Sequence, residues 1–221
     1  MNSASKKAIL VVSFGTSYEN TRKLTIEAIE HDIADAFPAC PTYRAWTSKM
    51  IIAKLKKRDG LTIHTVKEAL EQMLLDGITD VIVQPTHVIN GIENDQMKAD
   101  ALSFRDRFSS IVFGNPLLTT EEDNQAIVRV VADEFRDMDP DTALVLMGHG
   151  TEHYANTVYA ALDYRFKDTG HKNIFLGTVE AYPALDSLLR AAGSFHPKKI
   201  VLAPFMIVAG DHAQNDLAGA D

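Results

Sequence analysis

Cysteine, long apolar runs and an excess of basic residues are all lacking in this chain of 221 residues. Cys40 is the only cysteine, so the chain can form neither an intrachain disulfide nor a thiolate metal cage, which is typical of a reducing cytosol. No apolar run approaches the roughly 20 residues that span a membrane. The run at residues 8–12 precedes no small-residue cleavage site, so it indicates a first strand rather than a signal peptide.

The charge balance and the missing motifs exclude further classes of protein. The formal net charge of −8 argues against a nucleic-acid partner, because a phosphate backbone binds a basic surface. The chain carries no GxGxxG after a strand, no GxxxxGK[S/T] and no GxSxG, the marks of dinucleotide, phosphate-loop and α/β-hydrolase sites. We therefore expect a cytoplasmic protein that binds no nucleotide, no nucleic acid and no membrane.

What the chain does contain is an alternation of strand and helix patterns. Apolar, β-branched runs predict strands, and apolar residues at helical spacing predict helices at residues 18–37 and 121–138. Thr65 and Glu68 form a capping-box pattern at the start of another helix, and Gly77 follows the end of that helix. This alternation predicts an α/β fold with parallel sheets and helices on both faces. The expected strands are residues 8–14, 42–47, 80–84, 110–113, 142–147, 173–179 and 199–203.

The chain also resembles itself. The segment ILVVSFGTSYENT (9–21) aligns with LVLMGHGTEHYANT (144–157), and VIVQPTHVINGIEND (81–95) aligns with IVLAPFMIVAGDHAQND (200–216). A weaker pair, YRAWTSKMI and FLGTVEAYP, falls between them in the same order. We predict two similar Rossmann-like halves, residues 1–120 and 121–221, related by duplication and a pseudo-twofold axis, with a cleft between them. The second copy stops where its next helix should begin, so we expect a further segment beyond Asp221.

Polar residues follow three consecutive strands of the second half: His149, Glu180 and His212. Each is one βα unit, about 30 residues, from the next, so all three can reach the same edge of the sheet. Two imidazoles and a carboxylate suit Co²⁺, Ni²⁺, Fe²⁺ or Zn²⁺. Taken singly, each residue could instead be a loop or helix-cap residue, and the set together favours a metal site. The glycines on either side of His149 would let backbone and metal or substrate approach closely.

The first half lacks this set, because its aligned positions hold Phe14, Ser48 and Glu93. We infer that the second half holds the metal while the first shapes the pocket. Among the other histidines, His87 could touch a ligand, and His153 is either an outer partner of His149 or a solvent-facing residue. The rest are expected to be structural or surface residues: His31, His64, His171 and His196.

Five motifs together resemble the anaerobic sirohydrochlorin cobaltochelatases of cobalamin biosynthesis, a branch of the class II chelatases: VSFGTSY, VQPTHVINGIEND, MGHGTEHYAN, GTVEAYP and PFMIVAGDHAQND. The resemblance covers essentially the whole chain. It implies two α/β halves around a tetrapyrrole cleft, with the family's metal ligands falling on His149, Glu180 and His212. It also implies a chain that continues past Asp221 with a further strand and helix.

The implied reaction is insertion of Co²⁺ into sirohydrochlorin, or precorrin-2, with release of two protons and without ATP. A neutral imidazole is the natural proton acceptor near pH 7, so we expect His149 to be both base and metal ligand. His212 would be its partner, and Glu180 would hold the ion. The same site could serve a ferrochelatase, a nickel chelatase or a non-catalytic tetrapyrrole or metal carrier, and a homo-oligomer is left open.

The substrate carries many carboxylates, so a chain with net charge −8 needs local cations. Lys49 and Arg44 are expected nearest the cleft. Phe14, Lys49, Glu93 and Met206 are the expected contacts of the macrocycle or its metal. Trp46 and Met97 are further candidates, and core packing is equally plausible for Trp46 and Met206.

Overall fold

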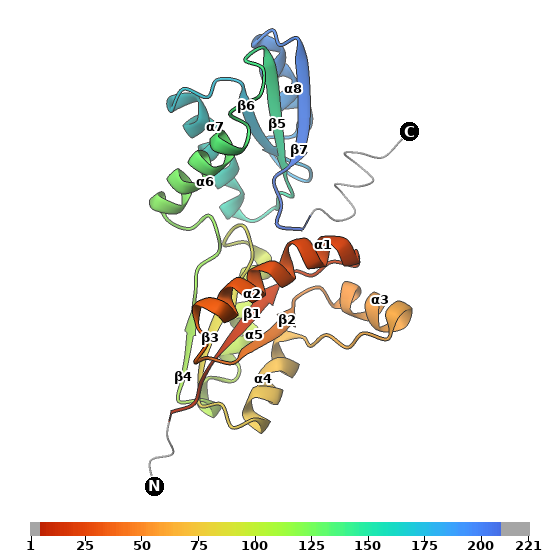
Figure 1. Ribbon diagram of the computed structural model, residues 1–221, viewed down its shortest axis with the longest axis vertical. Coiled ribbons are helices and arrows are strands. Elements are labelled where there is room, and N and C mark those ends of the chain that lie inside the picture. The colour runs from red at the N-terminus through yellow and green to blue at the C-terminus, as the bar shows by residue number, and fades with distance from the viewer. Residues whose placement is uncertain (1–4, 209–221) are drawn as a thin grey trace. The chain divides into compact units, whose positions relative to one another are not determined.

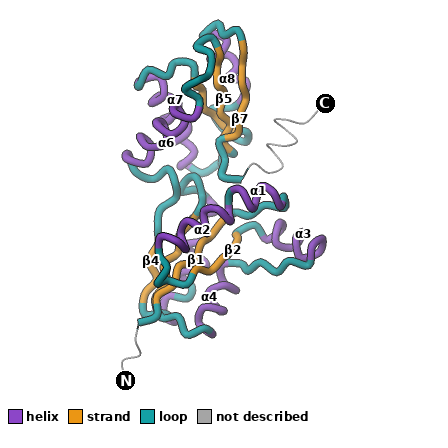
Figure 2. Tube along the Cα trace, in the orientation of Figure 1, coloured by secondary structure: helices purple, strands orange, loops and turns teal. Residues whose placement is uncertain are grey.

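The computed structural model describes residues 5–208 and divides into two compact units, Met1–Leu117 and Leu118–Asp221 (Figure 1). Each unit holds its own parallel sheet, with helices alongside the strands (Figure 2). The predicted α/β fold with parallel sheets is therefore confirmed. Among the described residues, every helix is too short or too polar to cross a lipid bilayer.

The first unit is a four-stranded sheet in the order β2-β1-β3-β4. Its central strand β1 is buried from Ala8 to Ser13, so side chains on both faces of the sheet are covered. The elements of this unit are β1 (Lys7–Ser13), α1 (Glu19–Leu24), α2 (Ile26–Ala36), β2 (Thr42–Trp46), α3 (Lys49–Asp59), α4 (Val66–Leu75), β3 (Asp80–Pro85), α5 (Ile92–Leu102), the short 3-10 helix η1 (Arg105–Arg107) and β4 (Ser110–Phe113).

The second unit is a three-stranded sheet in the order β6-β5-β7. Its central strand β5 is buried throughout, which explains the uninterrupted apolar run in the sequence. The elements are α6 (Glu121–Glu134), β5 (Thr142–Gly148), the short 3-10 helix η2 (Tyr154–Asn156), α7 (Thr157–Asp168), β6 (Ile174–Thr178), α8 (Leu185–Ser194) and β7 (Lys199–Pro204).

The two sheets repeat one arrangement. In each, the first strand of the unit lies between the second and the third. The register agrees as well, because Val12 of β1 pairs with Pro85 of β3, and the aligned residue Met147 of β5 pairs with Pro204 of β7. The internal repeat is thus a repeat of sheet topology and register.

Most local signals lie where the sequence indicated, with two differences. Thr65 and Glu68 form the expected capping box of α4, and Gly77 has the positive φ of a residue that follows a helix end. The helix expected at residues 18–37 is instead two helices, because Thr25 leaves helical geometry and its hydroxyl donates to the Thr21 carbonyl at 2.7 Å. The helix expected to reach residue 138 ends at Glu134.

Candidate metal centre

His149 and Glu180 come together at the carboxyl ends of two neighbouring strands. His149 follows β5 and Glu180 follows β6 shortly after its end. The Glu180 N–H donates to the His149 carbonyl at 2.9 Å, which continues the β5–β6 pairing past both strands. The His149 Nδ1 lies 3.6 Å from the Glu180 Oε2, and each side chain is 50% exposed. The pair therefore presents an imidazole and a carboxylate at one accessible edge of the sheet.

The backbone under this pair is the same as in the first unit. There the Ser48 N–H donates to the Phe14 carbonyl at 3.2 Å, the counterpart of the bond from Glu180 to His149. Phe14 thus occupies the backbone position in the first unit that His149 occupies in the second, as the sequence alignment indicates. The fold therefore does not require an imidazole at this position.

The two glycines beside His149 make room for the protein's own atoms. A Cβ on Gly148 would lie 2.5 Å from Cε1 of the buried Tyr159 ring. Gly150 has φ +87°, and a Cβ there would lie 2.8 Å from the Thr178 Cβ and 3.0 Å from the Ala181 nitrogen. The glycines thus allow close contact with α7 and with the segment that leads to Glu180. The expectation that they also let metal or substrate approach stays a prediction.

The hydrogen bonding of His149 selects one tautomer of its ring. Its Nδ1 lies 2.9 Å from the carbonyl oxygen of Gly150, which can only accept, so Nδ1 carries the proton. The lone pair is then on Nε2, the atom that would bind a metal ion or take up a proton. A backbone carbonyl that fixes the ring in this way is a usual outer partner of a metal-binding histidine.

The third predicted ligand, His212, lies outside the described residues. Within residues 5–208, no cluster of three or more histidine, cysteine, aspartate or glutamate side chains has the arrangement of a metal site. The described structure therefore supplies a histidine–carboxylate pair. The ligand role of all three residues stays a prediction.

The remaining predicted contacts lie on separate elements. Phe14 follows β1 and is 36% exposed, and Lys49 is an exposed residue that begins α3. Glu93 lies in the first turn of α5 and is partly buried, and Met206 lies just after β7, also partly buried. Each of these residues follows the carboxyl end of a strand, where ligands of such sheets bind.

Comparison with known proteins relates this geometry to a function. Residues 7–221 match the family model described as cobalt chelatase (CbiK). A sirohydrochlorin cobaltochelatase of Salmonella typhimurium LT2 is 38% identical over 216 residues, 98% of this chain and 81% of the relative.

The chain belongs to the cobalt chelatase family. A second relative, the sirohydrochlorin cobaltochelatase CbiKC of Nitratidesulfovibrio vulgaris Hildenborough, is 31% identical over 223 residues, 98% of this chain and 77% of the relative. The resemblance stated from the sequence motifs is thereby confirmed, and the chain is a metal chelatase whose substrate metal is cobalt.

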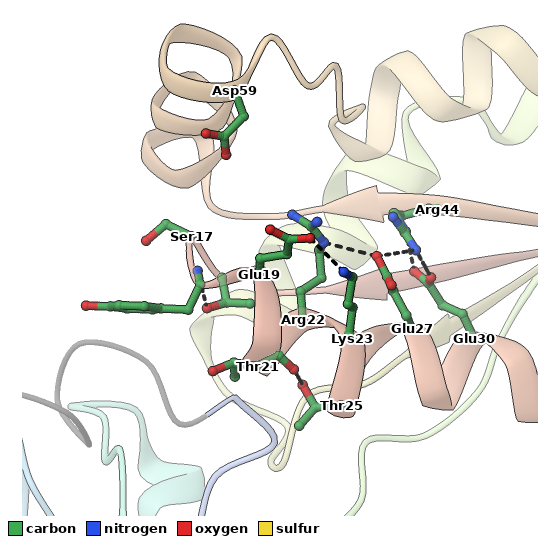
Figure 3. A network of polar contacts seen from close by, with 12 residues as sticks. Ser17, Glu19, Thr21, Arg22, Lys23, Thr25, Glu27, Glu30, Arg44 and Asp59 are labelled. Atoms are coloured by element: carbon green, nitrogen blue, oxygen red, sulfur yellow. Dashed lines mark hydrogen bonds and ion pairs between the residues drawn. The ribbon is translucent and has the colours of Figure 1, made fainter.

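Three residues that were considered as substrate contacts are instead paired with, or packed against, other residues of the first unit. Figure 3 shows Arg44 directed at Glu27 and Glu30 of α2, and its Nε donates to the Glu30 Oε1 at 2.7 Å. This bond raises the pKa of Arg44 and keeps the guanidinium paired. Trp46 and Met97 are both 0% exposed. Core packing, the alternative left open for Trp46, is therefore correct, and the expectation that Met97 lies against the macrocycle is wrong because its side chain is buried in the core.

Two histidines near strand ends have local roles. His153 caps η2, because its Nδ1 accepts the Ala155 N–H at 3.2 Å. Both ring nitrogens of His87 are buried, and neither has a hydrogen-bond partner in the described part of the chain. Burial lowers the pKa of His87 to about 4, so its ring is neutral at physiological pH.

One residue of the site region was missed by sequence reasoning. Asn156 makes side-chain hydrogen bonds to the loop that carries His149 and to the loop that carries Glu180. The sequence feature that could have drawn attention to Asn156 is the Asn-Thr pair that ends both copies of the first repeat, in SYENT and HYANT.

Proposed function

We propose that this protein inserts Co²⁺ into sirohydrochlorin, with release of the two pyrrole protons and without ATP, in the cytoplasm. The observation that carries the proposal is the His149–Glu180 pair, an imidazole and a carboxylate side by side at adjacent strand ends, with the His149 Nδ1 3.6 Å from the Glu180 Oε2. Support for the substrate comes from relatives named sirohydrochlorin cobaltochelatase that align with 98% of this chain. Such ligands suit a divalent ion of intermediate hardness such as Co²⁺.

We propose that Co²⁺ first binds to the Nε2 of His149, to Glu180 and to His212. When the ion passes to the macrocycle nitrogens, the Nε2 lone pair becomes available and can accept one of the two protons that leave the pyrrole nitrogens, while the other passes to water. The carboxylate of Glu180 next to the ring stabilises the positive charge on the imidazolium. The His149–Glu180 pair would thus first deliver the metal ion and then help to remove a proton.

We propose that Phe14 and Met206 contact the flat apolar face of the macrocycle. Lys49, an exposed cation at the start of α3, would bind a substrate carboxylate. Glu93 would approach the metal or the pyrrole nitrogens. Lys49 is the stronger candidate for carboxylate binding, because Arg44 is held by Glu30.

The test of the reaction is anaerobic steady-state insertion into sirohydrochlorin, followed by the absorbance change of the macrocycle. Co²⁺, Fe²⁺, Ni²⁺ and Zn²⁺ are compared on one substrate preparation. We expect a rate with Co²⁺ well above the uncatalysed reaction. No enzymatic rate with any of the four ions would refute the chelatase proposal, and a rate confined to Fe²⁺ or Ni²⁺ would refute cobalt.

The test of the site is His149→Ala. Loss of both a ligand and the proton acceptor should lower kcat by at least about 100-fold, the range of a general base, while the fold is kept. His171→Ala is the matched control, because His171 lies before β6, at the other end of the same sheet. Turnover like the wild type in His149→Ala would remove His149 from its assigned role.

A further inference from the structure

Asn156 connects the two loops that carry the proposed ligands. Its Oδ1 accepts the N–H of Thr151, two positions after His149, at 3.1 Å. Its Nδ2 donates to the carbonyl of Tyr182, two positions after Glu180, at 2.6 Å. A single amide side chain therefore uses both its acceptor and its donor to hold one loop to the other.

The place of Asn156 in its own helix leaves the side chain available for these two bonds. It is the N-cap residue of α7, and asparagine is among the residues that most often cap a helix N-terminus through the side chain. Here the side chain makes no capping hydrogen bond. Its backbone has helical φ and ψ and continues the short helix η2, so the side chain is not placed to cap α7, and both of its polar groups are directed to the loops.

The two hydrogen bonds of Asn156 complete a line of contacts between the loop after β5 and the loop after β6; we call this line the seam. The seam starts with the bond from the Glu180 N–H to the His149 carbonyl at 2.9 Å. Gly150 comes next, and its lack of a side chain lets the first loop lie against Thr178 and Ala181. Asn156 closes the outer end of the seam. The half-exposed side chains of His149 and Glu180 lie beside this seam, so the spacing of the loops determines the spacing of the pair.

We infer that Asn156 is a positioning residue, which fixes the separation and orientation of His149 and Glu180 by clamping their loops together. The inference rests on the proposed function of that pair as metal ligands. Residues that orient ligands from outside the coordination sphere change metal affinity by about 10–100-fold when they are mutated. Loss of the clamp should therefore weaken Co²⁺ binding without abolishing it.

The sharpest variant is Asn156→Asp, which keeps the size of the side chain. The carboxylate can still accept the Thr151 N–H, but it cannot donate to the Tyr182 carbonyl and repels that oxygen. Asn173→Asp is the matched control, because the Asn173 Nδ2 donates to the Thr142 carbonyl at 3.0 Å and links β6 to β5 at the opposite end of the same strands. The two changes remove the same kind of bond and differ in its distance from the site.

The first measurement is anaerobic Co²⁺ titration of the purified chain, read from the visible ligand-field absorption of the bound ion. We expect the dissociation constant to rise at least tenfold in Asn156→Asp, with an altered spectrum, and to stay within about twofold of wild type in Asn173→Asp. His149→Ala and Glu180→Ala are titrated in parallel. If either binds Co²⁺ like the wild type, the proposed metal site is wrong and the clamp fails with it.

The second measurement is steady-state insertion. Asn156→Asp should raise the KM for Co²⁺ and leave the KM for the tetrapyrrole unchanged, a pattern that general destabilisation would not produce. If Asn156→Asp binds Co²⁺ with the affinity and spectrum of the wild type while His149→Ala binds it weakly, the positioning role of Asn156 is wrong and the proposed function still holds. Asn156→Ala, which loses both hydrogen bonds, decides the matter in the same titration if the aspartate variant does not fold.

Discussion

Two histidines that follow strands in this protein have opposite environments. The His149 side chain is half exposed, and its Nδ1 lies beside a carbonyl and a carboxylate. The ring nitrogens of His87 are buried without a hydrogen-bond partner among the described residues. An unpaired buried imidazole resists protonation because its charged form would lose hydration. Residue type alone therefore does not tell a solvent-accessible histidine from a buried one after a strand.

His87 should make the protein sensitive to acid. Its pKa falls from 6.5 to about 4 on folding, so between these values the unfolded chain binds a proton that the folded chain does not. Stability is therefore complete above about pH 6.5 and is lost as the pH falls towards 4. From pH 7.5 to pH 5 this group should cost about 2 kcal/mol of unfolding free energy.

His87→Met, the residue at the aligned position of the second unit, removes the ionisable group and keeps a side chain of similar size. Urea unfolding at both pH values measures the effect. The variant should lose less stability than the wild type on acidification. An equal loss in the two proteins would contradict the assignment of this pH dependence to His87.

The turn after β5 shows how one element is adapted to the site. Gly148 and Gly150 let the chain lie against α7 and against the loop after β6, and Asn156 then connects the same loops. The first unit uses the same strand-to-loop frame with Phe14. The strand and the turn that follows it therefore have the same backbone in both units, and the chemistry of the turn depends on the single residue after the strand, Phe14 or His149.

Gly150→Ala should be more damaging than Gly170→Ala. Both glycines have positive φ, +87° and +96°, so alanine adds backbone strain of about 1–2 kcal/mol at either position. Only at Gly150 would the new Cβ also meet neighbours, at 2.8 and 3.0 Å, whereas nothing lies within 4 Å of a Cβ at Gly170. Overpacking should add about 1–3 kcal/mol. Unfolding free energies from urea titration compare the two, and equal losses would show that the contacts at Gly150 relax without cost.

At the scale of the whole molecule, the described residues form two units, each with its own sheet and its own cluster of buried apolar residues. The cluster around Leu70 of α4 lies within the first unit, and the cluster around Leu188 of α8 lies within the second. In the described part of the chain, no strand pairing joins the two sheets. Units built in this way can unfold in separate steps.

The single tryptophan, Trp46, makes separate unfolding measurable. It is fully buried in the first unit, so its fluorescence reports that unit, whereas far-UV circular dichroism reports both. Leu70→Ala and Leu188→Ala should each cost their own unit about 2–5 kcal/mol. We expect Leu188→Ala to lower the dichroism midpoint in urea and to leave the fluorescence midpoint unchanged, while Leu70→Ala lowers the fluorescence midpoint. Equal shifts of both probes in both variants would indicate one cooperative unit.

The sequence by itself determined the α/β class, the internal repeat, the capping box at Thr65 and the family motifs. These features depend on neighbours along the chain or on repeated order, which the sequence displays directly. The placement of His149 and Glu180 at adjacent strand ends follows from the same topology, and their role as metal ligands stays a prediction.

Only the tertiary structure decided which side chains meet across elements. It paired Arg44 with Glu30, buried Trp46 and Met97, placed Tyr159 against Gly148 and directed Asn156 away from its own helix. Such contacts join residues far apart in the chain, and they depend on packing distances of a few ångströms. No local pattern encodes them, because the same residue type fits a solvated, a paired and a buried position equally well until its neighbours are in place.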